Sequence, residues 1–270
     1  MGNFSIAADW IRSAQGVMVL AGAGMGVDSG LPDFRGDKGF WQSYPPYQAL
    51  GLNFAQVADP LHFDRDPAFG WGFYGHRLEL YRKTEPHRGY KILLDWGKRL
   101  GIEVFVVTSN VDGHFFQAGF EPSQVYEVHG SIHHLQCCEP CSEEIWENQE
   151  QVRLDLEQMR AVVVPKCPKC NRVSRPNILM FNDFHWNNKR SSRQEERFKE
   201  FLFRHQEHSL VALEIGAGLA VPTIRLMTET LARRGAKTIR INPVEPAITP
   251  PNLSLRKSGL EALTLIDQVL

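Results

Sequence analysis

The chain has no long apolar run, no excess of charge of one sign and no segment typical of secretion. No stretch of about 18 consecutive apolar residues occurs, so we expect no membrane span. Its 30 Lys and Arg balance 31 Asp and Glu, which disfavours nucleic acid as a partner because nucleic-acid binders are usually basic. The N-terminus lacks a basic region followed by an apolar core, and Ile6 stands where an N-acylation site has Ser or Thr. We therefore expect a cytoplasmic protein with neither a membrane nor a nucleic-acid partner.

The chain is long and apolar enough for one α/β domain with an inserted module, at 270 residues and 43% hydrophobic. Residues 37–70 are rich in Gly, Pro and aromatics without periodicity, and we expect a ligand-covering loop with short helices there. Alternating strands and helices elsewhere predict a parallel sheet covered on both faces. The expected strands are 17–20, 104–108, 125–128, 210–215 and 238–241, and the expected helices are 4–15, 71–99 in two pieces, 192–206 and about 221–234.

The segment 21–36, AGAGMGVDSGLPDFRG, is the most informative part of the chain. It follows an apolar strand, and Gly22, Gly24 and Gly26 free the backbone where that strand ends. Such a turn can hold a pyrophosphate on backbone N–H groups. Val27 occupies the third glycine position of the dehydrogenase fingerprint, and no acidic partner for a ribose follows ~20 residues later. The loop therefore predicts a nucleotide site of another type.

Polar residues also follow two further strands, at the edge where open α/β sheets bind ligands. One such group is 108–112, in which the Asn110 amide can both donate and accept, as a carboxamide or ribose requires. A strand-end turn would use the same residue types. His129 follows another strand and is the candidate general base, because imidazole exchanges protons near neutral pH. His133 and His134 compete for that role.

The five cysteines form two C-x₂-C pairs and one extra thiol. Cys138 and Cys141 form the first pair and Cys167 and Cys170 the second, with 25 residues between the pairs rather than the usual ~15–20 of a zinc ribbon. Four thiolates suit a closed, structural Zn²⁺ site, and two disulfides or free thiols are the alternative. Cys137 could replace Cys138 through an x₃ spacing, but the x₂ spacing is preferred.

Taken in this order, the motifs resemble those of the sirtuin family of NAD-dependent protein deacylases, over nearly the whole chain. The resemblance implies a Rossmann-like parallel sheet with helices on both faces and an inserted small zinc-ribbon module at residues 131–175. Residues 1–130 and 176–270 then form the NAD-binding domain, with a cofactor-binding loop at about 31–70. The matching motifs are Gly22-Ala23-Gly24, Pro32 to Gly36, Asn110 to Asp112, His129-Gly130, the two cysteine pairs and Ile241-Asn242.

The resemblance also implies the chemistry and its residues. NAD is consumed as a co-substrate: the acyl oxygen of an acylated lysine in a protein or peptide attacks the ribose C1′ as nicotinamide leaves, giving free lysine and O-acyl-ADP-ribose. His129 is the implied base, while Asn110 and Asp112 position the nicotinamide ribose and carboxamide. The implied cofactor-binding residues are Gly22, Ala23, Gly24, Asp33, Phe34, Arg35, Ser109, Asn110, Asp112, Gly216, Ala217, Gly218 and Asn242, and the implied zinc ligands are Cys138, Cys141, Cys167 and Cys170.

Tyr74 and Arg77 resemble the Tyr-x-x-Arg of sirtuins that prefer acidic acyl groups. Residues three apart share one face of a helix, and a phenol beside a guanidinium can hold a carboxylate. This pair predicts a preference for succinyl- or malonyl-lysine. A core tyrosine beside a solvated arginine is the alternative.

Several positions depart from the family pattern. Gly26 stands in place of Ser, Ser109 in place of Gln, Gly216-Ala217-Gly218 in place of Gly-Thr-Ser, and Phe181-Asn182-Asp183 in place of Phe-Gly-Glu. The lost hydroxyls leave backbone donors to contact NAD. One alternative function is that of an NAD hydrolase or ADP-ribosyltransferase. Another is that of an NAD-sensing module without activity, which the retention of Asn110, Asp112 and His129 disfavours.

Overall fold

A six-stranded parallel sheet forms the centre of the structure, a computed structural model that describes residues 2–32, 36–206 and 209–270. The strand order is β11-β10-β9-β1-β2-β3, so β1 lies between β2 and β9 and the chain order reverses there. Open α/β sheets bind ligands at such a reversal, beyond the carboxyl ends of the strands. The strands are β1 (Gly16–Ala21), β2 (Glu103–Thr108), β3 (Val125–Glu127), β9 (Leu210–Ile215), β10 (Lys237–Ile241) and β11 (Leu253–Leu255).

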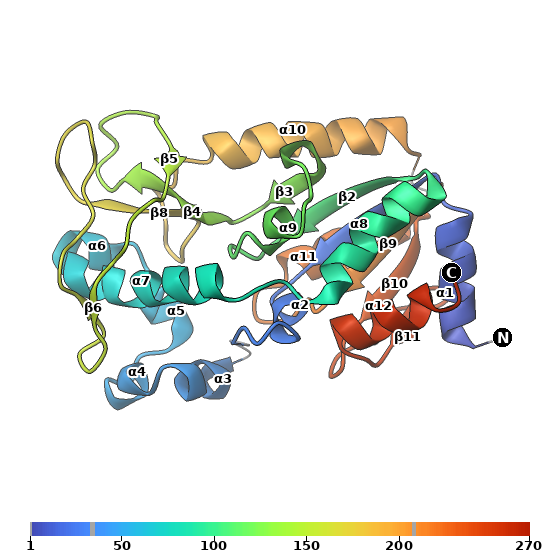
Figure 1. The fold of residues 1–270 in the computed structure, drawn as a ribbon, viewed down its shortest axis with the longest axis horizontal. Helices are drawn as coiled ribbons and strands as arrows, with labels where there is room; N and C mark the ends of the chain where they lie inside the picture. The colour runs from blue at the N-terminus through green and yellow to red at the C-terminus, as the bar shows by residue number, and fades with distance from the viewer. Residues whose placement is uncertain (1, 33–35, 207–208) are drawn as a thin grey trace.

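Helices cover both faces of this sheet, and successive β1 residues point into the two layers. Val17 and Val19 pack with α1, α8 and α12, whereas Met18 and Leu20 pack with α10 and α11. Figure 1 shows α10 and α12 on opposite sides of the strands. Every residue of β1 is buried, as expected for a parallel strand with two covered faces. The covering helices are α1 (Asn3–Arg12), α8 (Arg88–Leu100), α10 (Lys189–Arg204), α11 (Thr223–Arg233) and α12 (Gly259–Asp267).

A second core joins the helices that follow β1 to a small antiparallel sheet of order β5-β4-β8 (Figure 1). Phe40, Trp71 and Phe73 of the helices belong to the same buried cluster as Ile132 and Leu135 of β4. The segment expected to cover the ligand therefore forms short helices with their own core. The strands of this sheet are β4 (Gly130–Cys137), β5 (Trp146–Glu147) and β8 (Ser174–Ile178), while β6 (Leu154–Asp155) and β7 (Arg160–Ala161) form a separate two-stranded sheet. The helices are α3 (Gly36–Ser43), α4 (Pro45–Ala49), α5 (Phe54–Val57), α6 (Leu61–Arg65) and α7 (Pro67–Lys83).

The observed elements confirm the predicted α/β class. The five predicted strands are present with ends that agree within one residue, and the helical region expected in two pieces over 71–99 is divided into α7 and α8. β11 and α12 are not predicted, because a three-residue strand is too short to show a pattern. Three short segments complete the description: α2 (Gly24–Val27), α9 (His114–Gln117) and a 3₁₀ turn (Pro122–Gln124).

Over the part of the chain that the structure describes, no helix combines the length and the apolar character needed to cross a bilayer.

The packing of α7 against β7 depends on a glycine. A Cβ built on Gly72 would lie 1.7 Å from the backbone oxygen of Met159, whereas one built on Gly75 would meet the Val152 side chain at 2.9 Å. We expect Gly72→Ala to lower the free energy of unfolding by roughly 1–3 kcal/mol, because backbone cannot yield as a side chain can. Gly75→Ala on the same helix is the matched control and should lose less, since alanine also favours the helix. Equal losses in urea denaturation of the two variants would contradict this account.

Candidate active site

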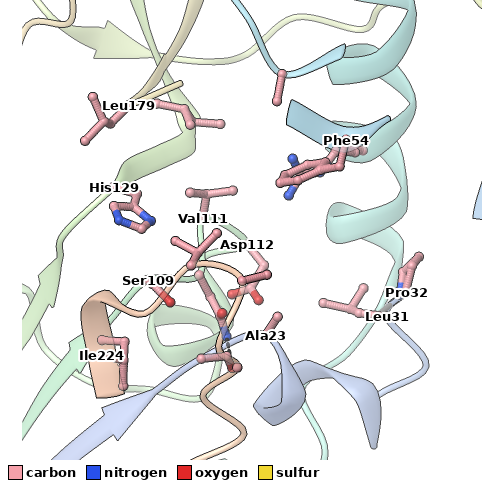
Figure 2. Close-up of a pocket in the computed structure, with 18 of the residues that line it drawn as sticks. Ala23, Leu31, Pro32, Phe54, Ser109, Val111, Asp112, His129, Leu179 and Ile224 are labelled. Carbon is pink, nitrogen blue, oxygen red and sulfur yellow. Dashed lines mark hydrogen bonds between the residues drawn. The ribbon is translucent and has the colours of Figure 1, made fainter. Parts of the chain in front are cut away.

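A cavity of about 370 Å³ opens at the carboxyl ends of β1, β2 and β9, where the strand order reverses. Figure 2 shows Ser109, Asp112 and His129 on one side of it and Leu31 and Phe54 on the other. Further parts of the wall come from the 216–218 loop, from α7, from residues 178–181 and from residues 220–224. The cavity therefore lies between the parallel sheet and the second core.

Two glycine-containing loops form the floor of the cavity by packing backbone against backbone. The Gly24 N–H donates to the Gly216 oxygen at 3.0 Å. A Cβ on Gly22 would lie 2.7 Å from the Cα of Ala217, and one on Gly216, at φ +63°, would lie 2.4 Å from the Gly24 carbonyl carbon. At Gly218, by contrast, a Cβ would meet no atom within 4 Å. This floor of glycine backbone, with open space beside Gly218, fits the close approach of a pyrophosphate.

Asn110 and Asp112 follow β2, and both line the cavity while being mostly buried. The Asn110 amide nitrogen donates to the Gly22 oxygen at 3.0 Å, which joins this segment to the glycine floor. The Asp112 carboxylate accepts from the backbone N–H of His114 at 3.0 Å. Fixed in this way, the two side chains present an amide and a carboxylate to the same space.

His129 lies in the turn between β3 and β4 and lines the cavity. Burial lowers its pKa, and a hydrogen bond to the Ser109 backbone opposes that shift. Its Nε2 lies 3.3 Å from the Thr223 hydroxyl. A histidine whose pKa is lowered is neutral at pH 7, the form that can accept a proton.

The two competing histidines are placed differently. His133 Nε2 lies 2.7 Å from the Asp112 backbone oxygen, and His134 has its pKa lowered to about 3, chiefly by burial. Neither is among the residues that line the cavity. Of these three described histidines, the geometry therefore favours His129 as a base.

Tyr74 and Arg77 of α7 both line the cavity. Arg77 is 7% exposed, so it is buried rather than solvated. Its Nε and Nη2 donate to the Tyr81 hydroxyl at 2.9 and 2.5 Å. The guanidinium carbon lies 5.2 Å from the centroids of both the Phe73 and the Tyr81 rings. An aromatic enclosure of this kind stabilises a buried cation.

Not every expected site residue reaches the cavity. Asp33, Phe34 and Arg35 lie outside the described residues. Asn242 is fully buried, and its amide nitrogen donates to the Ala217 oxygen at 3.0 Å from beneath the 216–218 loop. Asn242 and Gly24 are not among the residues that line the cavity, and their expected part in NAD binding stays a prediction. The expected residues that do line the cavity are Gly22, Ala23, Ser109, Asn110, Asp112, His129, Gly216, Ala217 and Gly218, with Tyr74 and Arg77 on α7.

Sequence reasoning missed Tyr81 and Arg225. Tyr81 lies four residues after Arg77 on one helix face, a spacing that could have predicted their contact. Arg225 on α11 donates from Nη2 to the Ala217 oxygen at 2.8 Å, a tertiary contact that no local pattern announces.

Four thiols gather at the far ends of β4 and the segment that leads to β8. The sulfur atoms of Cys137, Cys141, Cys167 and Cys170 all lie within 4.8 Å of one another. Cys137 and Cys170 are 3.6 Å apart, as are Cys141 and Cys167, whereas a disulfide needs about 2.05 Å. Tetrahedral zinc with Zn–S bonds of about 2.3 Å would hold its sulfurs at about 3.8 Å, so the cluster fits a structural Zn²⁺.

The cluster corrects the expected ligand set, because it contains Cys137 in place of Cys138. Neighbouring residues of an extended chain point in opposite directions, so only one of two adjacent cysteines can face the cluster. The Cys138 side chain packs against the second core instead, and burial raises its pKa to about 12.

Comparisons with known proteins find relatives that are similar in sequence and in fold. A family model described as the Sir2 family matches residues 22–206. An NAD-dependent protein deacylase of Thermococcus kodakarensis is 31% identical over 90% of this chain and 86% of its own length. An NAD-dependent protein deacetylase of Halalkalibacterium halodurans is 30% identical over 89% and 88%. A solved Sir2 homologue–NAD complex is 26% identical, with a TM-score of 0.75 over 98% of this chain and 93% of that one.

We expect the purified protein to contain about one zinc per chain and to lose thermal stability when a chelator removes it, since metal binding of this kind contributes to folding. Cys137→Ser should lose the metal, and Cys138→Ser, the matched control, should retain it. Elemental analysis and thermal melts of both variants provide the test. Metal retained by Cys137→Ser and lost by Cys138→Ser would restore the x₂ ligand set.

Proposed function

The chain belongs to the Sir2 family, and from this premise we propose that it is an NAD-dependent protein-lysine deacylase that releases nicotinamide and O-acyl-ADP-ribose. The observation that carries the proposal is the convergence of His129, Asn110 and Asp112 on one cavity beside a glycine floor. A protein that binds NAD without turning it over would need only the glycine floor. A base, an amide and a carboxylate in the same space supply groups that a reaction needs.

The floor residues are suited to hold NAD. Gly22, Ala23 and the 216–218 loop would contact its pyrophosphate, and Ser109, Asn110 and Asp112 its nicotinamide half. When bound, NAD supplies an activated ribose carbon whose nicotinamide leaves. Asn110 and Asp112 are mostly buried, so water would screen their contacts with bound NAD only weakly.

His129 and Asn110 have different roles in the proposed reaction. Neutral His129 takes a proton from a ribose hydroxyl, and its ring is oriented for this by its bond to the Ser109 backbone. The Asn110 amide is held by Gly22, so it can orient the ribose without moving. The zinc cluster takes no part in this chemistry, because four protein sulfurs leave the metal no open position.

The acylated lysine enters from a protein or peptide partner. Leu179, Phe181 and Val221 line the cavity, and each is 37% exposed. They lie after β8 and before α11, on two separate segments. We propose that an extended peptide lies between these segments as an added strand, with its acyl-lysine directed inward.

Release of nicotinamide from NAD, with and without an acylated peptide, tests the function. We expect release only with the peptide, and His129→Ala should lower it by ~10²–10⁴, the usual effect of losing a general base. His134→Ala, outside the cavity, is the matched control. Peptide-independent release would indicate an NAD hydrolase, and near-normal turnover by a folded His129→Ala would assign the base to another residue.

We further propose that the acyl pocket prefers a succinyl or malonyl group. The support is the buried guanidinium of Arg77, which lines the cavity with the phenol rings of Tyr74 and Tyr81 around it. A carboxylate there gains charge-assisted hydrogen bonds, which an acetyl group cannot make. The preference rests on Arg77, which supplies the only charge in that pair.

Arg77→Met should lower kcat/KM for a succinyl-lysine peptide by about tenfold or more and spare the acetyl reaction, because one charge-assisted hydrogen bond is worth roughly 1.5–3 kcal/mol. Lys83→Met is the matched control: it removes a cation from the same helix but an exposed one. Steady-state kinetics with both peptides would check this. A wild type that prefers acetyl-lysine, or equal losses on both peptides, would refute the acidic pocket.

A further inference from the structure

The 216–218 loop is held from beneath by two buried side chains that grip one carbonyl. Arg225 Nη2 donates to the Ala217 oxygen at 2.8 Å, and the Asn242 amide donates to the same oxygen at 3.0 Å. Arg225 is 7% exposed and Asn242 fully buried, so both approach from the protein interior. Both lone pairs of this carbonyl are therefore used on the side away from the cavity.

This grip fixes the direction of a backbone donor. The Ala217–Gly218 peptide is trans, so its N–H points opposite to its C=O. With the Ala217 oxygen turned to the interior, the Gly218 N–H faces the cavity. No acceptor for this N–H is present among the described residues, and a Cβ on Gly218 would meet nothing within 4 Å. The loop thus presents one free donor to open space.

A buried charge network supports the Arg225 end of the grip. Arg225 Nη2 lies 4.0 Å from Glu214 and also donates to the Glu245 backbone oxygen at 3.1 Å. Glu214 is fully buried in β9 and pairs with Arg240 of β10 at 2.7 Å. Buried ion pairs contribute little net stability compared with apolar residues of similar size, so stability alone is a weak reason for this network. The contacts of Arg225 with the Ala217 oxygen give this network another role, which is to orient the 216–218 loop.

We propose that Arg225 is a positioning residue for the dinucleotide: by holding the Ala217 carbonyl it aims the Gly218 N–H at an oxygen acceptor of bound NAD. The proposal rests on the proposed NAD-dependent function and deepens it. It also explains how the loop can bind the cofactor without side-chain hydroxyls. The Gly218 N–H serves as the donor to NAD, and Arg225 sets its direction by holding the Ala217 carbonyl on the interior side of the loop.

NAD binding by calorimetry, without acyl peptide, tests the proposal independently of turnover. We expect Arg225→Met to weaken NAD binding about tenfold, the loss of roughly one hydrogen bond. Arg225→Gln keeps an amide donor without the charge and should lose less. Glu229→Gln is the matched control, since Glu229 lies on the same helix and pairs with Arg240 at 3.3 Å without touching the loop. In kinetics, KM for NAD should rise while kcat and KM for the peptide stay unchanged.

The outcomes separate this inference from the function on which it rests. A wild type that binds no NAD would refute the proposed function. NAD affinity unchanged in a folded Arg225→Met, with only its melting temperature lowered, would leave Arg225 a purely structural role and overturn the inference. Amide NMR of the wild type covers the case of a variant that does not fold. The Gly218 N–H resonance should shift on adding NAD or ADP-ribose, and its constancy at saturation would overturn the inference.

Discussion

The backbone contact between the loops after β1 and β9 is the constraint on which the site depends. Both strands end at the point where the sheet order reverses, and the Gly24 N–H donates across that point to the Gly216 oxygen. The approach is too close for side chains, since a Cβ at Gly22 or Gly216 would lie under 3 Å from the opposite backbone. Glycine at these positions therefore creates the floor of the cavity and also its open space.

The second constraint joins the cysteine cluster to the candidate base. β4 pairs with β8 at both of its ends, with an irregularity between Ser131 and Leu135; cysteine ligands lie at one end and His129 just before the other. The Leu179 N–H donates to the His129 oxygen at 2.9 Å, and a Cβ on Gly130 would lie 2.1 Å from the Asn177 oxygen. A metal that fixes one end of this pair thereby fixes the backbone that carries the imidazole, although it lies outside the cavity.

Sequence patterns predicted what local physics determines. Buried apolar runs gave the parallel strands, and polar residues at their ends gave Asn110, Asp112 and His129, because the carboxyl ends of parallel strands share one edge. Spacing favoured Cys138 over Cys137 and was wrong, since only the direction of the side chains from the strand distinguishes the two neighbours. The contact of Asn242 with the Ala217 oxygen could not be predicted, because it joins segments that are far apart in the sequence.

The role of Arg225 also depends on tertiary contacts, so the sequence alone does not predict it. Within α11 it is one charged residue among several on an amphipathic helix, and Glu214 interrupts a strand that otherwise looks apolar. Each is unfavourable alone, because a buried charge costs several kcal/mol when it lacks a partner. Arg225, Glu214 and Arg240 form a buried ion-pair network beneath the 216–218 loop, in which each charge has a partner. A charge inside a predicted parallel strand is therefore informative, because it requires a partner on a neighbouring element.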